Sequence, residues 1–377
     1  MLDEASALRR RGDEVWVLAT GRSSQPEYEL KDGIHLLRYI PEKVAPWNPA
    51  RSSAHQKAAR PVLMRNLPQV DVIHGHAPLP YLAALDVYGD RVHSCYDIHS
   101  PARMEMAIVW RHSGILQRIT APAGLAMINH LERECLRRSR AISAESRYTI
   151  GCIDQLHGSE LARNVQVFPG WVDTARYTPV EDLRQAKAQL GWPRDIPVFF
   201  TLRRLAPRMG LDRLLTAAHR LHREGIEFHL AIGGSGPMRT SLELQATNLG
   251  LGDVVTFMGR IEDEVLPLAY AACDAFVLPT AELECFGLIA IEALSAGRPV
   301  LATPVGSIPE ILEKFEPCWL ARSAEASEIA DLLRRFLAGK LPEHSPAQLH
   351  ELAQRHYSRE LLVPLYIEAM IGSNGLT

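Results

Sequence analysis

The sequence predicts an α/β protein of two Rossmann-like domains, each built on a parallel β-sheet that is covered by helices. Its 377 residues are enough for two hydrophobic cores, because one domain takes roughly 150 residues. Apolar segments of strand length alternate with longer segments of helix length, and this alternation is typical of parallel strands joined by helices. Polar or glycine-rich loops follow several of the expected strands, which is where open α/β sheets bind ligands.

The first half of the chain supplies the elements of one domain. Its first eleven residues read as the second part of a helix, which turns into a strand after Gly12-Asp13-Glu14. A sheet that lacks a strand before this point would expose an unpaired, apolar edge. Two helices between Arg103 and Arg140 are expected to break near Pro122, because proline interrupts a helix. The other expected elements are strands at 15–19, 33–39, 70–74, 92–98, 141–144 and 164–168, and helices at 52–67, from about 80, and ending near 156.

The second half repeats the alternation and ends in helices. The expected strands are 198–202, 227–232, 254–258 and 275–278. The expected helices are 182–190, one from 211, one at 286–296, and three closing helices at 325–337, 346–355 and 358–370. No internal repeat or low-complexity tract interrupts the pattern.

Composition argues against several classes of protein. Forty-one Lys and Arg against 44 Asp and Glu do not suit a dedicated nucleic-acid binder. No run of about 18 apolar residues and no signal peptide occur, so neither a membrane span nor secretion is expected. The six cysteines lack C-x-x-C spacing, which favours a reduced cytoplasmic protein over a disulfide framework or a zinc site. Basic clusters at 9–11 and 133–140 are interpreted as solvated helix faces; a peripheral contact with anionic lipid at the inner face of a membrane is the alternative.

Two carboxylates stand in apolar surroundings within residues 279–300, PTAELECFGLIAIEALSAGRPV. Glu284 lies in a loop after a strand, and Glu292 lies inside the helix that follows. Small or apolar residues flank Glu292 one turn before and after, so no face of this helix is solvated in the usual amphipathic way. Buried acids are normally paired, and the partner of Glu292 is either a protein group or a ligand.

The ends of this helix carry recognisable signals. Gly297 is expected to cap its carboxyl end, and Gly287 leaves free amides at its amino end, where a phosphate is favoured. Cys285, between the two features, is interpreted as a small apolar filler.

The pattern E-C-F-G-L-I-A-I-E, from Glu284 to Glu292, resembles the E-x7-E signature of the retaining glycosyltransferases of family 4, which have the GT-B fold. The continuation A-L-S-A-G-R-P-V and the run VGSIPE at 305–310 strengthen the resemblance. It spans nearly the whole chain, is dense from 164 to 312, and is thin before that.

The resemblance implies two Rossmann-like domains whose parallel sheets face each other across a cleft. It assigns residues 1–173 to an acceptor-binding domain, 174–357 to a nucleotide-sugar-binding domain, and 358–377 to a helix that crosses back onto the first domain. In the family a first strand and a glycine-rich loop precede the segment at which this sequence begins. The run Pro169-Gly170-Trp171-Val172-Asp173 resembles the family's crossover P-N-G-V-D, with Trp171 in place of a glycine.

The loop RRLAPRMG at 203–210 resembles the family pattern G-R-L-x-x-x-K-G, in which Arg and Lys clamp the diphosphate. Arg204 matches the arginine of the pattern, and Met209 occupies the lysine position. Arg208 is expected to supply the second charge, because cations near a helix start make a credible diphosphate site.

Further donor-binding residues follow from the resemblance. The loop GGSGP at 233–237 resembles the family's G-x-G-P loop and implicates Gly234. The backbone at Arg260 and Ile261 is expected to hold the nucleotide base. Phe286, Gly287 and Leu288 are expected to belong to the segment that meets the donor phosphates.

Histidines follow two strands of the first domain. His74, His76 and His99 stand at expected carboxyl ends of strands, where ligands collect. A histidine in such a place is more often a loop residue than a catalytic one. His99 is the candidate we favour, because the family carries a histidine at the matching strand end beside the donor sugar and the acceptor.

The expected function is transfer of a sugar, with retention, from a nucleotide-diphosphate donor to an acceptor bound mainly by the first domain. Glu292 would accept hydrogen bonds from the ribose, Glu284 from the transferred sugar, and His99 would orient that sugar. No D-x-D pair occurs, so a metal-independent reaction without a cofactor is expected, in which protein cations and amides offset the charge of the leaving group. The alternatives are a non-catalytic nucleotide-sugar binder, suggested by Met209 and the absent strand, and a nucleotide-sugar epimerase.

Overall fold

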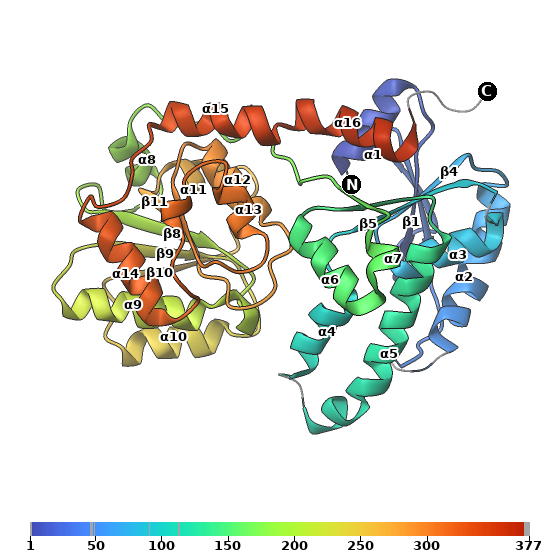
Figure 1. Cartoon of the computed structure of the whole chain (residues 1–377), viewed down its shortest axis with the longest axis horizontal. Coiled ribbons are helices and arrows are strands. Elements are labelled where there is room, and N and C mark those ends of the chain that lie inside the picture. Colours follow the sequence, from blue (N-terminus) through green and yellow to red (C-terminus); the bar gives the residue numbers. More distant parts are fainter. Residues whose placement is uncertain (1, 46–47, 49, 90, 112–113, 373–377) are drawn as a thin grey trace. The chain divides into compact units, whose positions relative to one another are not determined.

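The computed structural model describes residues 2–45, 48, 50–89, 91–111 and 114–372. The chain divides into two compact units. Unit 1 comprises the chain up to Pro169 together with the segment from Leu361 onward, and unit 2 comprises Gly170–Glu360. Both units are layered α/β structures, as Figure 1 shows.

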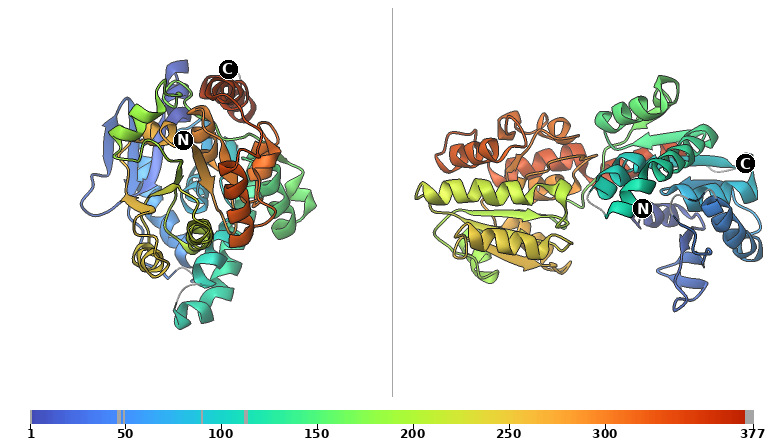
Figure 2. Two further views of the ribbon diagram at one scale, coloured as in Figure 1. Left: turned by 90° about the vertical axis from the view of Figure 1, so that its left-hand side faces the viewer. Right: turned by 90° about the horizontal axis from the view of Figure 1, so that it is seen from below.

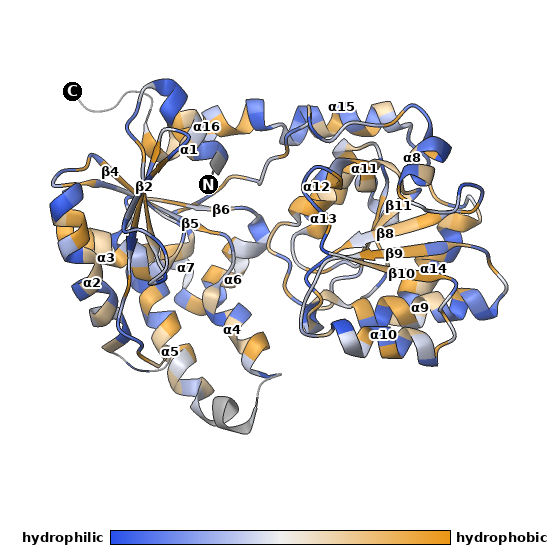
Figure 3. Cartoon of the chain, turned by 180° about the vertical axis from the view of Figure 1, so that it is seen from behind, coloured by the Kyte–Doolittle hydropathy of each residue, from blue (hydrophilic) through white to orange (hydrophobic). Residues whose placement is uncertain are grey.

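Unit 2 is built on one parallel sheet whose strand order is β10-β9-β8-β11-β12. Every neighbouring pair in this sheet is parallel. Two central strands, β8 and β11, are buried almost throughout, which is typical of a sheet covered on both faces. The hydropathy colouring of Figure 3 shows them as apolar ribbons. The strands are β8 (Val198–Leu202), β9 (His229–Gly233), β10 (Val255–Gly259), β11 (Ala275–Leu278) and β12 (Val300–Ala302).

Helices cover both faces of this sheet (Figures 1 and 2). On one face α9 packs against α10 and α14, and on the other α12 packs against α11 and α15. The buried leucines of α9 recur at positions 211, 214, 215 and 221, the spacing of an apolar stripe on a helix. The helices are α8 (Leu183–Gln189), α9 (Leu211–Arg223), α10 (Arg239–Asn248), α11 (Leu266–Ala271), α12 (Leu288–Ser295), α13 (Ile308–Leu312), α14 (Ala326–Leu337) and α15 (Pro346–Tyr357), with 3-10 turns η1 (Pro207–Met209) and η2 (Pro317–Trp319).

The strands of unit 1 form two separate sheets, ordered β1-β3-β2 and β4-β5-β6-β7. In the described residues β1 pairs only with β3, and β4 pairs only with β5, so each sheet ends in a strand with one unpaired side. The strands are β1 (Trp16–Thr20), β2 (Tyr28–Lys31), β3 (Ile34–Tyr39), β4 (Val72–Gly75), β5 (His93–Ile98), β6 (Ala141–Ala144) and β7 (Val165–Val167).

Helices pack around one hydrophobic core in unit 1, which joins residues of β3, β5 and β6 to residues of α2, α3 and α5. The helices are α1 (Leu2–Arg11), α2 (Ala50–Asn66), α3 (Pro78–Tyr88), α4 (Ala102–Arg111), α5 (Ile115–Arg138), α6 (Arg147–His157), α7 (Ser159–Ala162) and α16 (Arg359–Ile371). No helix in the described ranges is both long and apolar enough to cross a membrane.

The helices between Arg103 and Arg140 do not break where the sequence predicted. Pro122 lies inside α5, and the boundary between α4 and α5 falls some ten residues earlier. Proline removes one hydrogen bond from a helix interior. Burial of Leu131, Cys135 and Leu136 of α5 in the core supports the helix despite that loss.

The expected closing helix is confirmed. The segment of α16 from Leu361 belongs to unit 1, where its buried face is formed by Val363, Tyr366, Ile367 and Met370. The carbonyl oxygen of Met370 accepts hydrogen bonds from His93 Nε2 at 2.7 Å and from Cys95 Sγ at 2.8 Å. The last helix therefore provides a hydrogen-bond acceptor for two side chains of β5.

Candidate functional site

The loops of unit 2 that the sequence singled out meet at one edge of its sheet. Leu202, at the end of β8, pairs with Gly233 of β9, which in turn pairs with Gly259 of β10. On the other side, Leu278 of β11 pairs with Ala302 of β12. Because all neighbouring strands are parallel, their carboxyl ends lie at this edge. This is the edge at which open α/β sheets bind ligands.

Glu284 is held there by a buried ion pair. Arg203 Nη2 lies 2.7 Å from Glu284 Oε2, and Thr280 Oγ1 donates to the same oxygen at 2.9 Å. The Arg203 side chain is 3% exposed and the Glu284 side chain 14%. A buried carboxylate needs such partners, so the structural requirement of Glu284 is met by Arg203 and Thr280.

The two arginines named from the sequence, Arg204 and Arg208, differ in their surroundings. Arg204 is exposed, one residue beyond the buried Arg203. Arg208 Nη1 donates to the carbonyl oxygen of Leu283 at 2.7 Å, and the Arg208 carbonyl accepts from the amide of Ala281 at 2.9 Å. Arg208 thus ties its loop to the loop that carries Glu284, and Arg204 is accessible to a ligand.

Two glycines allow the loops at this edge to approach each other closely. Gly234 has φ +113°, and a β-carbon there would lie 1.8 Å from the carbonyl oxygen of Arg203. Gly306 has φ +66°, and a β-carbon there would lie 1.9 Å from the carbonyl oxygen of Glu284. Both conformations favour glycine. The two glycines lie against the backbone carbonyls of Arg203 and Glu284, the residues of the ion pair.

Glu292 lies on α12 and bonds to tyrosines. Tyr270 Oη donates to Glu292 Oε2 at 2.6 Å, and Tyr177 also hydrogen bonds to this carboxylate. Burial raises the pKa of Glu292, and the hydrogen bonds from the two tyrosines oppose that rise only in part. The side chain is half-buried, so a ligand hydroxyl can still reach it.

The start of α12 carries the remaining candidates of this segment. Gly287 is the residue that precedes the helix. Leu288 is 46% exposed, whereas Phe286 is buried and its ring lies edge-on to the ring of Tyr357. Phe286 therefore packs in the core of unit 2, Gly287 is itself buried, and Leu288 is the exposed residue of the three. The expected cap at Gly297 is present, with φ +76°.

Arg260 and Ile261 follow β10 at the same edge. Gly234 N donates to the carbonyl of Gly259 at 2.6 Å, which joins the loop after β9 to the loop after β10. Ile261 packs over Gly233, and Arg260 is exposed.

In unit 1 the sequence-selected histidines form a chain of hydrogen bonds. His99 Nε2 lies 3.0 Å from His76 Nδ1, and the two rings stack. His99 Nδ1 lies 3.0 Å from Glu145 Oε1, and this bond raises the pKa of His99 above its usual value. His99 is 47% exposed at its side chain. It is thus oriented by Glu145 and His76, and one face of it is open to a ligand.

Asp97 holds one end of this histidine network through a hydrogen bond to His74. Its carboxylate accepts from His74 Nε2 at 3.0 Å, and from the hydroxyls of Ser143 and Tyr366. Burial by itself would raise the pKa of Asp97, but hydrogen bonds and positive charge from His74 and His76 hold it below the usual value. Asp97 is therefore a buried, ionised anchor at the end of β5.

Four side chains of this network could each offer a metal ligand. These are Glu4, His74, His76 and Asp97, whose ligand atoms lie within 4.8 Å of one another. The same atoms already bond to one another: His74 to Asp97 and to Tyr366, and His76 to Glu4 at 3.3 Å. We interpret the cluster as a hydrogen-bond network that fixes the histidine rings.

Replacing Asp97 with asparagine is expected to lower the free energy of unfolding at pH 7 by about 2 kcal/mol, because hydrogen bonds to a charged group are lost. Since the folded-state pKa is depressed, this stabilisation is present above the unfolded pKa of about 3.9 and is lost as the pH falls through the folded value. Urea unfolding of both proteins between pH 7 and pH 3 measures it. Asp71→Asn, at an exposed position, is the control. A difference that stays constant down to pH 3 would contradict the assignment.

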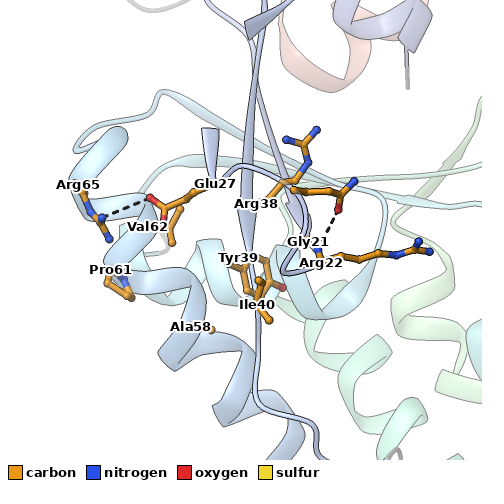
Figure 4. Close-up of a pocket in the computed structure, with 11 residues that line it drawn as sticks. Gly21, Arg22, Glu27, Arg38, Tyr39, Ile40, Ala58, Pro61, Val62 and Arg65 are labelled. Carbon is orange, nitrogen blue, oxygen red and sulfur yellow. Dashed lines mark hydrogen bonds and ion pairs between the residues drawn. The ribbon is translucent and has the colours of Figure 1, made fainter. Parts of the chain in front are cut away.

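A separate pocket of about 320 Å³ in unit 1 is lined by three arginines, Arg22, Arg38 and Arg65 (Figure 4). Arg65 lies 3.6 Å from Glu27, and Arg38 lies 2.6 Å from Glu29. Glutamates offset the charge of two of the arginines, so the pocket presents little net positive charge to an anion. The network around His99 is the better candidate for function in this unit.

Several residues of both sites were missed from the sequence. Arg203, Thr280 and Tyr270 contact the two glutamates, and Tyr366 joins the histidine network from the far end of the chain. One feature of the sequence could have identified Arg203: it is a charged residue directly after the apolar strand VFFTL. No feature of the sequence indicates the contact between Tyr366 and Asp97, because the two residues are 269 positions apart.

Comparison with protein-family models matches both halves of the chain. Residues 182–356 match the model described as "Glycosyl transferases group 1", and residues 1–176 match the model described as "Glycosyltransferase Family 4". Together the two models span nearly the whole chain.

A curated relative from Mycolicibacterium smegmatis is a GDP-mannose-dependent alpha-(1-6)-phosphatidylinositol monomannoside mannosyltransferase. It is 34% identical over 188 residues, which are 47% of this chain and 49% of the relative. A 2-deoxystreptamine glucosyltransferase from Streptomyces kanamyceticus is 28% identical over 62% of this chain and 59% of its own length. The chain thus spans about half the length of the curated relatives it matches.

Solved structures match the whole architecture. Sucrose-phosphate synthase from Thermosynechococcus elongatus superposes with a TM-score of 0.76 at 21% identity, covering 98% of this chain and 92% of that one. The HepE protein of Anabaena, solved with UDP and glucose, superposes with a TM-score of 0.73 at 18% identity, over 97% and 93% of the two chains. At such identities these matches establish the fold, which is GT-B.

Proposed function

The chain belongs to the group 1 glycosyltransferases of family 4, and from this premise we propose that it transfers a sugar from a nucleotide-diphosphate donor to an acceptor. The observation that carries the proposal is the meeting of five loops at the carboxyl edge of the unit 2 sheet. Those loops bring an exposed arginine, a glycine-rich turn and the carboxylate of Glu284 to this end of the sheet, and the helix α12 that follows one of them carries Glu292. This combination suits a diphosphate linked to groups rich in hydroxyls.

The donor is proposed to bind unit 2 through its charge and its hydroxyls. Arg204, which is exposed, would pair with the diphosphate, and the amides after Gly287 at the start of α12 would donate to it. Glu292, which already accepts from Tyr270, would accept from the ribose. The backbone at Gly234, Arg260 and Ile261 would hold the base.

The transfer step is proposed to retain the configuration of the sugar and to need no metal ion or cofactor. Glu284 would accept hydrogen bonds from hydroxyls of the transferred sugar. His99, oriented by Glu145, would orient the sugar. The acceptor hydroxyl would attack from the face that the phosphate leaves, and the leaving phosphate oxygen would take its proton. Cationic and amide groups would offset the charge that develops on that phosphate.

The reaction is proposed to take place in the cytoplasm, because the six cysteines lack C-x-x-C spacing and this cysteine usage suits a reducing compartment. Relatives and neighbours indicate which donors to try first. The mycobacterial relatives are named for GDP-mannose, and the Anabaena protein was solved with UDP-glucose. Uridine and guanosine diphosphate sugars are therefore the first candidates, and the acceptor is a glycan, a lipid-linked molecule or a small molecule.

We expect the protein to bind UDP or GDP, and Arg204→Ala to weaken that binding roughly 10- to 100-fold, because a charge-assisted bond to phosphate is lost. Glu292→Ala is expected to weaken it as well, through the ribose. Calorimetric titration measures both. Arg184→Ala, at an exposed surface ion pair, is the matched control and should bind as the wild type does. Unchanged affinity in Arg204→Ala would remove Arg204 from the diphosphate site.

Product analysis with labelled donor sugars separates the alternatives. A transferase yields free nucleotide together with a glycosylated acceptor or hydrolysed sugar. An epimerase changes the donor without an acceptor and releases no nucleotide for transfer. A chain that binds nucleotide diphosphate tightly but consumes no donor would instead be a non-catalytic binder, and the proposal of transfer would fail.

A further inference from the structure

The Arg203 guanidinium is a buried charge with one nitrogen unused. Its Nη2 atom contacts Glu284, whereas Nη1 is buried and has no hydrogen-bond partner. Arg203 as a whole is 6% exposed. A buried polar group without a partner costs free energy, so an unfilled donor beside a candidate catalytic carboxylate points to a ligand that supplies the acceptor.

The guanidinium of Arg203 contacts the uncharged side chain of Met209. Arg203 Nη2 lies 2.6 Å from Sδ of Met209, and Met209 is itself buried. Met209 stands where the pattern of the loop has a lysine. Residue 209 has no positive charge, but the guanidinium of Arg203 places a positive charge beside its side chain.

Both ends of the ion pair are fixed by the backbone. Arg203 N donates to the carbonyl of Gly233 at 3.1 Å, and Gly234 lies directly against the Arg203 carbonyl. The carbonyl of Glu284 accepts from the amide of Ser307 at 2.9 Å. With the backbone held at both residues, the direction of the Glu284 carboxylate depends on its side-chain bonds to Arg203 and Thr280.

The neighbouring arginines do not perform this role in the described structure. Arg208 bonds to the carbonyl of Leu283, and Arg204 is exposed beyond the end of β8. Burial alternates along this segment, because Arg203 and Leu205 are buried and Arg204 between them is exposed.

We propose that Arg203 is a positioning residue of the transfer reaction: it holds the Glu284 carboxylate in one orientation, and its Nη1 donates to an oxygen of the bound donor beside Glu284. Arg203 is thereby added to the two cations, Arg204 and Arg208, that the sequence predicts for the donor site. This inference rests on the proposed function, because it assigns Arg203 a part in the same reaction.

The experiment compares four variants with wild type by kcat and KM for the donor, nucleotide affinity and thermal unfolding. Arg203→Met removes the charge, and Arg203→Lys keeps a charge without the two-pronged fork. The double variant Arg203→Met with Met209→Lys moves the charge from residue 203 to residue 209. Arg184→Met makes the same chemical change at a side chain that is 68% exposed and is the control.

Arg203→Met is expected to lower kcat about 100-fold, the cost of a misplaced catalytic group, and to raise KM for the donor by about tenfold, because the hydrogen bond from Nη1 is lost. Arg203→Lys should lower kcat about tenfold, because an ammonium cannot replace a planar fork. The double variant should recover at least about a tenth of wild-type kcat, and Arg184→Met should match wild type. A merely structural arginine would lower the unfolding temperature in Arg203→Lys and leave kcat unchanged, and that result would overturn the proposal.

Should Arg203→Met fail to fold, Arg203→Lys and the double variant decide. Recovery of kcat in a folded double variant supports the proposal, and a folded double variant without activity overturns it. Failure of the proposed function looks different, because the wild-type chain would then transfer no sugar from any donor. If wild type transfers sugar and both folded Arg203 variants keep its kcat, only the inference about Arg203 fails.

Discussion

Replacing Glu284 with alanine is expected to remove nearly all sugar transfer and to lower the free energy of unfolding by about 3 kcal/mol. The stability loss arises because Arg203, with a side chain that is 3% exposed, would remain charged and without its carboxylate. The hydroxyl of Thr280 would lose its acceptor as well. Turnover with labelled donor and urea unfolding measure the two effects.

Glu284→Gln separates chemistry from stability. Glutamine keeps the shape of the side chain and one oxygen that can accept from Arg203 or Thr280, so the loss of stability should be smaller. Turnover should still fall roughly 100-fold, since the charged acceptor for the sugar hydroxyls is gone, while nucleotide affinity changes less than about tenfold. Glu243→Ala, which breaks an exposed Arg–Glu pair on α10, should cost no more than about 1 kcal/mol. A fully active Glu284→Gln would exclude Glu284 from the transfer step.

Replacing Gly306 with alanine is expected to destabilise unit 2 by at least about 3 kcal/mol and to reduce transfer strongly. A non-glycine residue at φ +66° costs about 1–3 kcal/mol by itself. The new β-carbon would also lie 1.9 Å from the Glu284 carbonyl oxygen, so the backbone of the catalytic candidate must move. Thermal unfolding and turnover with labelled donor measure the result.

Gly250 offers a matched control for this substitution. It has φ +69°, close to that of Gly306, but a β-carbon there would meet nothing within 4 Å. Gly250→Ala should therefore cost about 1–3 kcal/mol from its backbone conformation alone and leave transfer unchanged. The excess loss in Gly306→Ala is then the cost of pushing the Glu284 backbone. Equal losses of stability in the two variants would show that the close approach of Gly306 to the Glu284 carbonyl does not contribute to stability.

The sequence predicts strands better where they are buried in a parallel sheet. The bounds of β6, β8 and β11 agree with the prediction, because each is a short apolar run that no helix pattern fits. The strand β2 was missed. It is a mostly exposed edge strand, YELK, whose polar composition is not typical of a strand.

For the candidate site, the sequence identifies the loops but not the contacts within them. The resemblance names Arg204, whereas the side chain that bonds to Glu284 belongs to Arg203. Which of two adjacent arginines faces inward depends on how the backbone leaves β8, and a sequence pattern does not record that. The tyrosines that bond to Glu292 and Asp97 come from distant helices and loops, so only the folded chain brings them there.

The place of α16 also determines when unit 1 can be finished during synthesis. His93 and Cys95 bond to the carbonyl of Met370, 277 and 275 residues later in the chain. A ribosome delivers residues from the amino end, so these bonds form only after all of unit 2 has been made. Unit 2 is continuous from Gly170 to Glu360 and waits for no later segment. The unit that is translated second is therefore the first whose residues are all available to fold.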